Sequence, residues 1–86
     1  MAERTITIVN PSGLHARPAA LVVELAKRYH GTVEVIKDGK SADMKSILMV
    51  LAMGLKQGTE ITLRAAGEDE DEFLESLCSY ILSLDS

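Results

Sequence analysis

The chain has 86 residues, nine of them basic and thirteen acidic, for a formal net charge of −4, and 47% of its residues are hydrophobic. This length allows one domain, over residues 1–86, and the apolar content excludes a disordered chain. The negative charge and the 3% aromatic content exclude a nucleic-acid clamp, and no apolar run reaches the ~20 residues that cross a membrane.

The first half of the chain predicts a strand, a helix and a hairpin. Residues 5–9 alternate polar and apolar side chains, which indicates a strand. Apolar side chains then recur at helical spacing from residue 16 to about residue 29. Residues 32–37 alternate again, Asp38-Gly39 favours a tight turn, and residues 40–43 form the returning strand.

The second half predicts a short helix, a fourth strand and a final helix. Ser46 precedes an apolar run over residues 47–53, which indicates a helix with Ser46 as its N-cap. Residues 60–65 alternate as a strand does. The acidic residues 68–72 suit a helix N-terminus, and an apolar stripe continues to Leu84. The order βαββαβα predicts an α/β (α+β) fold, an open-faced β-sandwich with a four-stranded, mostly antiparallel sheet and three helices on one face.

Residues 13–19, Gly-Leu-His-Ala-Arg-Pro-Ala, place His15 where the first helix begins. The first turn of a helix has N–H groups without intrahelical partners and about half a positive charge, so it favours a bound phosphate. Pro18 fits this turn because its missing N–H group needs no partner there. Arg17 adds a guanidinium that binds phosphate oxygens. The segment therefore predicts a phosphate site around His15.

The chemistry expected at this site is attack by His15 on a phosphoryl group. The helix end and Arg17 both disfavour imidazolium, and a neutral ring is a nucleophile. The product carries roughly −1.5 to −2 charges, which the same groups stabilise. A surface histidine taken alone more often has no function. Here the loop, Arg17 and Pro18 around His15 favour the functional interpretation. A protein that only carries a phosphoryl group on a histidine requires neither a metal nor a cofactor, and we expect neither.

These residues resemble the active-site signature of the HPr family, the histidine-containing phosphocarriers of the bacterial sugar phosphotransferase system. The chain length, Lys45-Ser46-Ile47 and residues 54–58 also fall where this family has them. The resemblance implies one HPr-like domain that receives a phosphoryl group from Enzyme I and passes it to a IIA domain. Such a chain is a phosphoryl-transfer intermediate rather than a free-standing enzyme.

The resemblance also assigns roles to single residues. His15 is the phosphoryl acceptor, through its pros nitrogen, and Arg17 stabilises the phosphate. The phosphate-binding set implied by the family comprises Ser12, Ala16 and Arg17.

Ser46 is the second candidate site. The resemblance is to members in which this serine is phosphorylated by HPr kinase/phosphorylase, which lowers transfer from Enzyme I and brings in a catabolite-control transcription factor as a further partner. Met49 and Asp43 depart from the glycine and asparagine that such members commonly carry. A role as helix N-cap alone is the alternative.

The short helix that follows Ser46 is too apolar to bury every side chain in so small a domain. We expect an exposed patch near His15 that includes Ile47, Leu48 and Met53. The resemblance implies that this patch docks Enzyme I and IIA domains. A transient carrier gains from loose association, so we expect a monomer.

Two other functions stay open at this stage. A regulatory HPr paralogue would act by protein binding in nitrogen or carbon control, although such a paralogue typically lacks the histidine. A ligand-binding or hydrolytic α/β domain would need an acid–base pair near His15, and none is evident in the first half of the sequence.

Two further residues receive no functional role. The single cysteine, Cys78, cannot form an internal disulfide, which suits a cytoplasmic protein, and we expect it to be a small buried apolar residue. His30 follows the first helix, where we expect it to act as a charge partner of the helix C-terminus.

Overall fold

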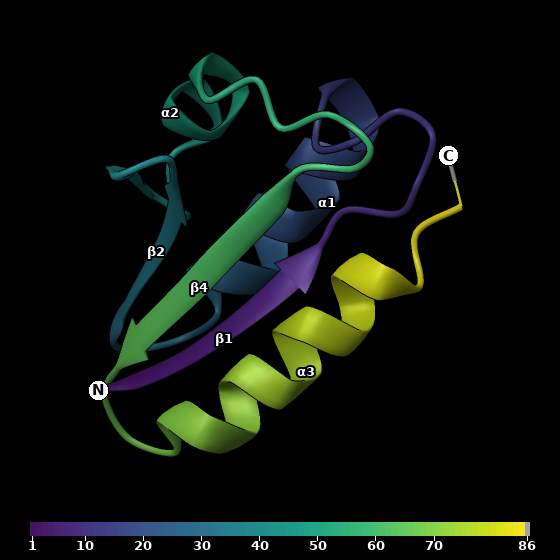
Figure 1. The fold of residues 1–86 in the computed structure, drawn as a ribbon. Helices are drawn as coiled ribbons and strands as arrows, with labels where there is room; N and C mark the ends of the chain where they lie inside the picture. The colour runs from purple at the N-terminus through teal and green to yellow at the C-terminus, as the bar shows by residue number, and fades with distance from the viewer. Residues whose placement is uncertain (86) are drawn as a thin grey trace.

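The computed structural model describes residues 1–85 and shows seven elements in the predicted order (Figure 1). The strands are β1 (Ala2–Thr7), β2 (Thr32–Lys37), β3 (Lys40–Asp43) and β4 (Glu60–Ala66), and the helices are α1 (Ala16–Lys27), α2 (Ile47–Ala52) and α3 (Glu70–Leu82). The strands form one antiparallel sheet in the order β1-β4-β2-β3. The predicted open-faced sandwich is therefore confirmed.

One apolar core joins a single face of this sheet to the helices. In β4, which pairs with strands on both sides, Ile61, Leu63 and Ala65 are buried, whereas the residues between them are only half-buried. On the other face Arg64 Nε lies 2.8 Å from Glu3 Oε2. The period-two pattern that predicted this strand therefore corresponds to a sheet with one covered and one open face.

The first strand differs from its prediction at both ends. β1 begins at Ala2 because residues 2–4, which give little alternation signal, pair with residues 63–65 of β4. It ends at Thr7, and Ile8 continues the contact outside the regular ladder. The Ile8 N–H group donates to Thr59 O over 2.9 Å, and Ile8 O accepts from the Gly58 N–H group over 2.7 Å. Pairing across the sheet thus sets the strand bounds, not local pattern alone.

Two residues without a predicted function lie differently from expectation. Cys78 is half-buried rather than fully buried, and burial raises the pKa of its thiol. α1 ends at Lys27 with Arg28 as C-cap, so the exposed His30 lies beyond the helix. Lys27, not His30, is the basic residue of the last turn.

The turn after α1 is held by Lys45, whose Nζ donates to Tyr29 O and Gly31 O over 2.7 Å each. Lys45→Met should lower the free energy of unfolding by about 1–3 kcal/mol, because two charge-assisted hydrogen bonds are lost. Urea denaturation measures this loss. The exposed Lys40→Met is the control and should change stability by less than about 0.5 kcal/mol. Equal effects of the two variants would contradict this role of Lys45.

Candidate functional site

His15 stands at the N-cap of α1, in extended backbone conformation (φ −132°, ψ 150°), and its side chain is exposed. Within residues 1–85 the His15 side chain makes no capping hydrogen bond to the helix N–H groups. The first-turn N–H groups, which have no intrahelical partners, lie at the same end of α1 as His15. Pro18 is buried in the first turn, where it needs no N–H partner. The predicted place of the imidazole, open to solvent at a helix N-terminus, is what the structure shows.

The loop before His15 is fixed by the segment that follows α2. The Leu14 N–H group donates to Leu55 O over 2.8 Å, and both Leu14 and Leu55 are buried. Gly13 has φ +61°, and a Cβ there would strike Leu55 O and come within 2.8 Å of Lys56 Cα. Glycine is required at this position, since two stretches of backbone meet there.

Asn10 was not recognised from the sequence as part of the site. It is 1% exposed and is the only polar or charged residue that is buried among residues 1–85. Its Nδ2 donates to Gly13 O over 2.8 Å, and Asn10 O accepts from the Gly13 N–H group over 3.1 Å. Pro11 and Gly13 indicate a turn after Asn10, but nothing in the sequence indicates that Asn10 is buried.

Ala16, which directly follows His15, has φ +50°. This left-handed conformation costs a residue with a Cβ about 1 kcal/mol or more, so neighbouring contacts must stabilise it. The strain lies at the junction between the His15 loop and α1. Its position indicates that the loop conformation, not local preference, sets how α1 begins.

A groove of about 560 Å³ runs beside His15, between residues 11–15 and residues 51–57. Ser12 and His15 both line it, which brings two predicted site residues together. Among the described residues that line it, Lys56 is the basic one, and Arg17 lies outside it, exposed on the first turn of α1. The groove therefore places the histidine at the edge of a surface that another molecule can approach.

The predicted docking residues differ in exposure. Leu48 is 77% exposed, whereas Ile47 and Met53 are half-buried against the core. Met49, which was not in the predicted set, is 45% exposed. The exposed part of α2 therefore consists mainly of Leu48 and Met49.

Ser46 is the N-cap of α2, as predicted, and its Oγ accepts from the Met49 N–H group over 3.3 Å. Asp43 Oδ1 accepts from the Lys45 N–H group over 2.9 Å, and Asp43 O from the Ser46 N–H group over 3.0 Å. Asp43 therefore shapes the turn that presents Ser46.

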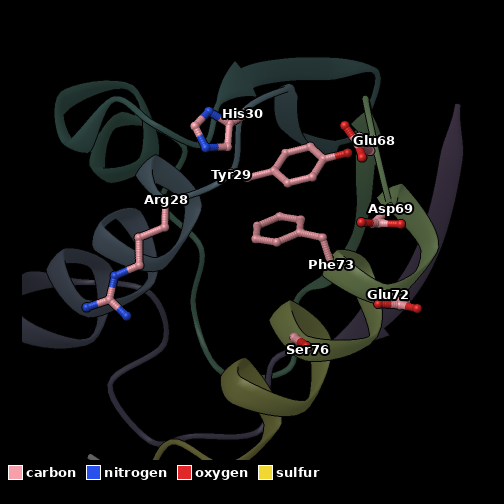
Figure 2. A pocket seen from close by; sticks show the side chains of 8 residues that line it. All are labelled: Arg28, Tyr29, His30, Glu68, Asp69, Glu72, Phe73 and Ser76. Atoms are coloured by element: carbon pink, nitrogen blue, oxygen red, sulfur yellow. The ribbon is translucent and has the colours of Figure 1, made fainter.

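A second hollow, of about 500 Å³, lies beyond the C-terminal end of α1, whereas His15 is at the N-terminal end. Figure 2 shows the side chains that line this hollow. The rings of Tyr29 and Phe73 stack there with centroids 4.3 Å apart and planes 14° from parallel. Burial, followed by the charges of nearby acids on and before α3, raises the pKa of the Tyr29 hydroxyl. His30 lines this hollow, so the two histidines of the chain lie in separate surroundings.

No cluster of three or more metal-ligating side chains occurs within residues 1–85. In the same part of the chain, none of the helices combines the length and the apolar character that spanning a membrane requires.

The sequence matches a known family over almost its whole length. Residues 2–83 fit the profile described as PTS HPr component phosphorylation site. The chain belongs to the HPr family. Phosphocarrier protein HPr of Lysinibacillus sphaericus is 39% identical over 84 residues, which are 98% of this chain and 96% of that protein. HPr-like protein Crh of Bacillus subtilis (strain 168) is 43% identical over 81 residues, 94% of this chain and 95% of that protein.

Solved HPr structures share the fold. HPr-C-His from Thermoanaerobacter tengcongensis is 43% identical with a TM-score of 0.93, over 96% of this chain and 93% of that chain. HPr of the same organism, solved as a dimer, gives a TM-score of 0.75 over 96% of this chain and 95% of that chain. The HPr fold has thus been solved as a dimer in at least one relative.

Proposed function

We propose that this HPr-family chain accepts a phosphoryl group on His15 from Enzyme I and passes it to a IIA domain of the sugar phosphotransferase system. The observation that carries the proposal is the exposed imidazole at the N-terminus of α1, with Arg17 on the same helical turn. Membership of the HPr family supports these two partners.

The transfer needs few groups from this chain. A ring nitrogen of neutral His15 donates its lone pair to phosphorus, and the bond between phosphorus and the donor atom of Enzyme I breaks, with its electron pair leaving on that donor. The first-turn N–H groups of α1 and the Arg17 guanidinium then stabilise the added negative charge. To deliver the group, an acceptor atom of the IIA domain donates a lone pair to phosphorus, and the bond between phosphorus and the His15 nitrogen breaks, with its electron pair returning to the ring. Exposure of His15 lets both partners reach the same ring.

Incubation with Enzyme I and phosphoenolpyruvate tests this proposal. The chain should acquire an acid-labile, base-stable phosphate and lose it when a IIA domain is added.

A second candidate function, regulation by protein binding, is favoured by the similarity to Crh, which is described as the Bacillus subtilis Catabolite Repression HPr. Absence of label with Enzyme I would contradict the carrier function and favour this second one.

Arg17→Ala should lower the rate of transfer from Enzyme I by roughly tenfold to a hundredfold and shorten the lifetime of the phosphorylated histidine. The reason is that the guanidinium stabilises the charged product, while its exposed position makes it dispensable for folding. Rapid-quench kinetics and the hydrolysis rate measure the two effects. Arg28→Ala, at the exposed far end of α1, is the matched control and should leave both rates unchanged. Identical kinetics in the two variants would exclude this role of Arg17.

We propose, further, that phosphorylation of Ser46 by HPr kinase/phosphorylase regulates docking and brings in a catabolite-control transcription factor. Ser46→Asp should raise the KM of Enzyme I for the chain and leave stability nearly unchanged, because aspartate is also a good N-cap. Steady-state kinetics and urea denaturation measure the two quantities. Ser46→Asn, a neutral N-cap, is the control, and an equal KM in both variants would argue against regulation by charge.

The partner-docking surface we propose consists of Ile47, Leu48 and Met53, extended by the exposed Met49. Loose docking suits a monomer that two partners use in turn, and we propose the monomer as the working form.

Because the relay starts from phosphoenolpyruvate, an intracellular metabolite, we also propose that the chain works in the cytoplasm.

A further inference from the structure

The mechanism above makes no use of Asn10, the one buried polar residue among residues 1–85. Placing an amide among apolar side chains is unfavourable unless hydrogen bonds offset the loss of water. At 1% exposure Asn10 cannot contact a docking partner. Asn10 can therefore influence the site only through its hydrogen bonds to the loop before His15.

These bonds fix the conformation of that loop. The Asn10 side chain and main chain both bond to Gly13, over 2.8 Å and 3.1 Å, so residues 10–13 form a closed turn. The adjoining Val9 O accepts from Gln57 Nε2 over 2.9 Å. Leu14 is then held by Leu55 O. Val9 and Leu14 are thus tied to residues 55–57, and Gly13 is tied to Asn10.

The left-handed conformation at Ala16 shows that this part of the backbone does not adopt its position by local preference. A turn that is closed by a buried amide resists relaxation of that strain, since a large shift of Gly13 would break the bond from Asn10 Nδ2 to Gly13 O. Loss of the amide would let the loop move, and His15 would move with it.

We propose that Asn10 is a positioning residue for phosphoryl transfer, whose amide sets the His15 ring at the N-terminus of α1. This inference rests on the proposed carrier function. Because Asn10 is buried and acts through the loop, its loss should affect the transfer step and leave docking affinity intact.

Two variants test the proposal in the Enzyme I assay. Asn10→Asp keeps the shape of the side chain and removes the N–H donor to Gly13 O, and Asn10→Ala removes the amide without adding a charge. In each variant that far-UV circular dichroism shows to be folded, kcat should fall roughly tenfold to a hundredfold, with KM within about a factor of two. The hydrolysis of the phosphorylated histidine, which involves no partner, should be faster as well.

Val33→Ala is the control for lost stability, because Val33 is buried in β2 and pairs with Ala65 near the start of β1, away from the His15 loop. It should lower stability and leave kcat unchanged. A kcat for Asn10→Ala equal to that of Val33→Ala would show that Asn10 is merely structural and overturn the proposal. A raised KM with unchanged kcat would overturn it also, in favour of a docking role. Wild-type chain that takes no phosphate would instead defeat the carrier function itself.

Discussion

Replacing His15 with alanine is expected to abolish phosphorylation by Enzyme I and phosphoenolpyruvate, a loss larger than roughly a thousandfold. The imidazole supplies the only lone pair that the proposed step uses, so no neighbouring group can replace it. The free energy of unfolding should stay within about 0.5 kcal/mol of wild type, because the ring is exposed and caps no N–H group among residues 1–85. Phosphate incorporation and urea denaturation give the two quantities.

His30→Ala is the matched control, since His30 is the second of the two histidines and lies beyond the C-terminal end of α1, where it lines the hollow shown in Figure 2. It should incorporate phosphate at the wild-type rate. If His15→Ala still incorporated acid-labile phosphate and His30→Ala did not, the residue assignment would be wrong, although the chain would still be a carrier.

Gly13→Ala is expected to have the largest effect on stability, a loss of about 3 kcal/mol. Alanine is strained at φ +61°, and its Cβ would strike the main chain of Leu55 and Lys56, which cannot move aside as a flexible side chain can. The collision should also break the bond from the Leu14 N–H group to Leu55 O, so transfer from Enzyme I should slow in the molecules that remain folded.

Gly39→Ala separates backbone strain from collision, because Gly39 has φ +78° and open space where a Cβ would lie. That variant should lose only about 1 kcal/mol and transfer phosphate normally. Thermal or urea unfolding of the two variants compares them directly. Equal losses at both positions would mean that the contact between Gly13 and residues 55–56 contributes nothing beyond the strain of φ.

The elements of the fold were predictable because each one carries a local signal. Period two in β4 and helical spacing in α1 reflect which side chains face the core, and Asp38-Gly39 fits its turn through backbone conformation. The place of His15 was predictable for the same reason, since Gly13 and Pro18 mark a loop that ends in a helix. Ser46 as N-cap follows from its position before an apolar run.

What the sequence did not show depends on contacts between distant segments. The start of β1 depends on pairing with β4, and the burial of Asn10 depends on how the loop folds over the core. The positive φ of Ala16 is not a preference of alanine, so composition gives no sign of it. The exposure of Met49 was also missed. All residues of α2 are apolar, so the sequence has no polar side chain that marks which face of the helix is exposed.

The most direct test of the account is nitrogen and phosphorus NMR of the ¹⁵N-labelled chain after phosphorylation by Enzyme I and phosphoenolpyruvate. The account predicts coupling between phosphorus and the pros nitrogen, Nδ1, of His15, with the signals of the His30 ring unchanged. Coupling to a nitrogen of His30, or phosphate bound to the chain with no nitrogen coupled to it, would contradict the claim that His15 carries the phosphoryl group.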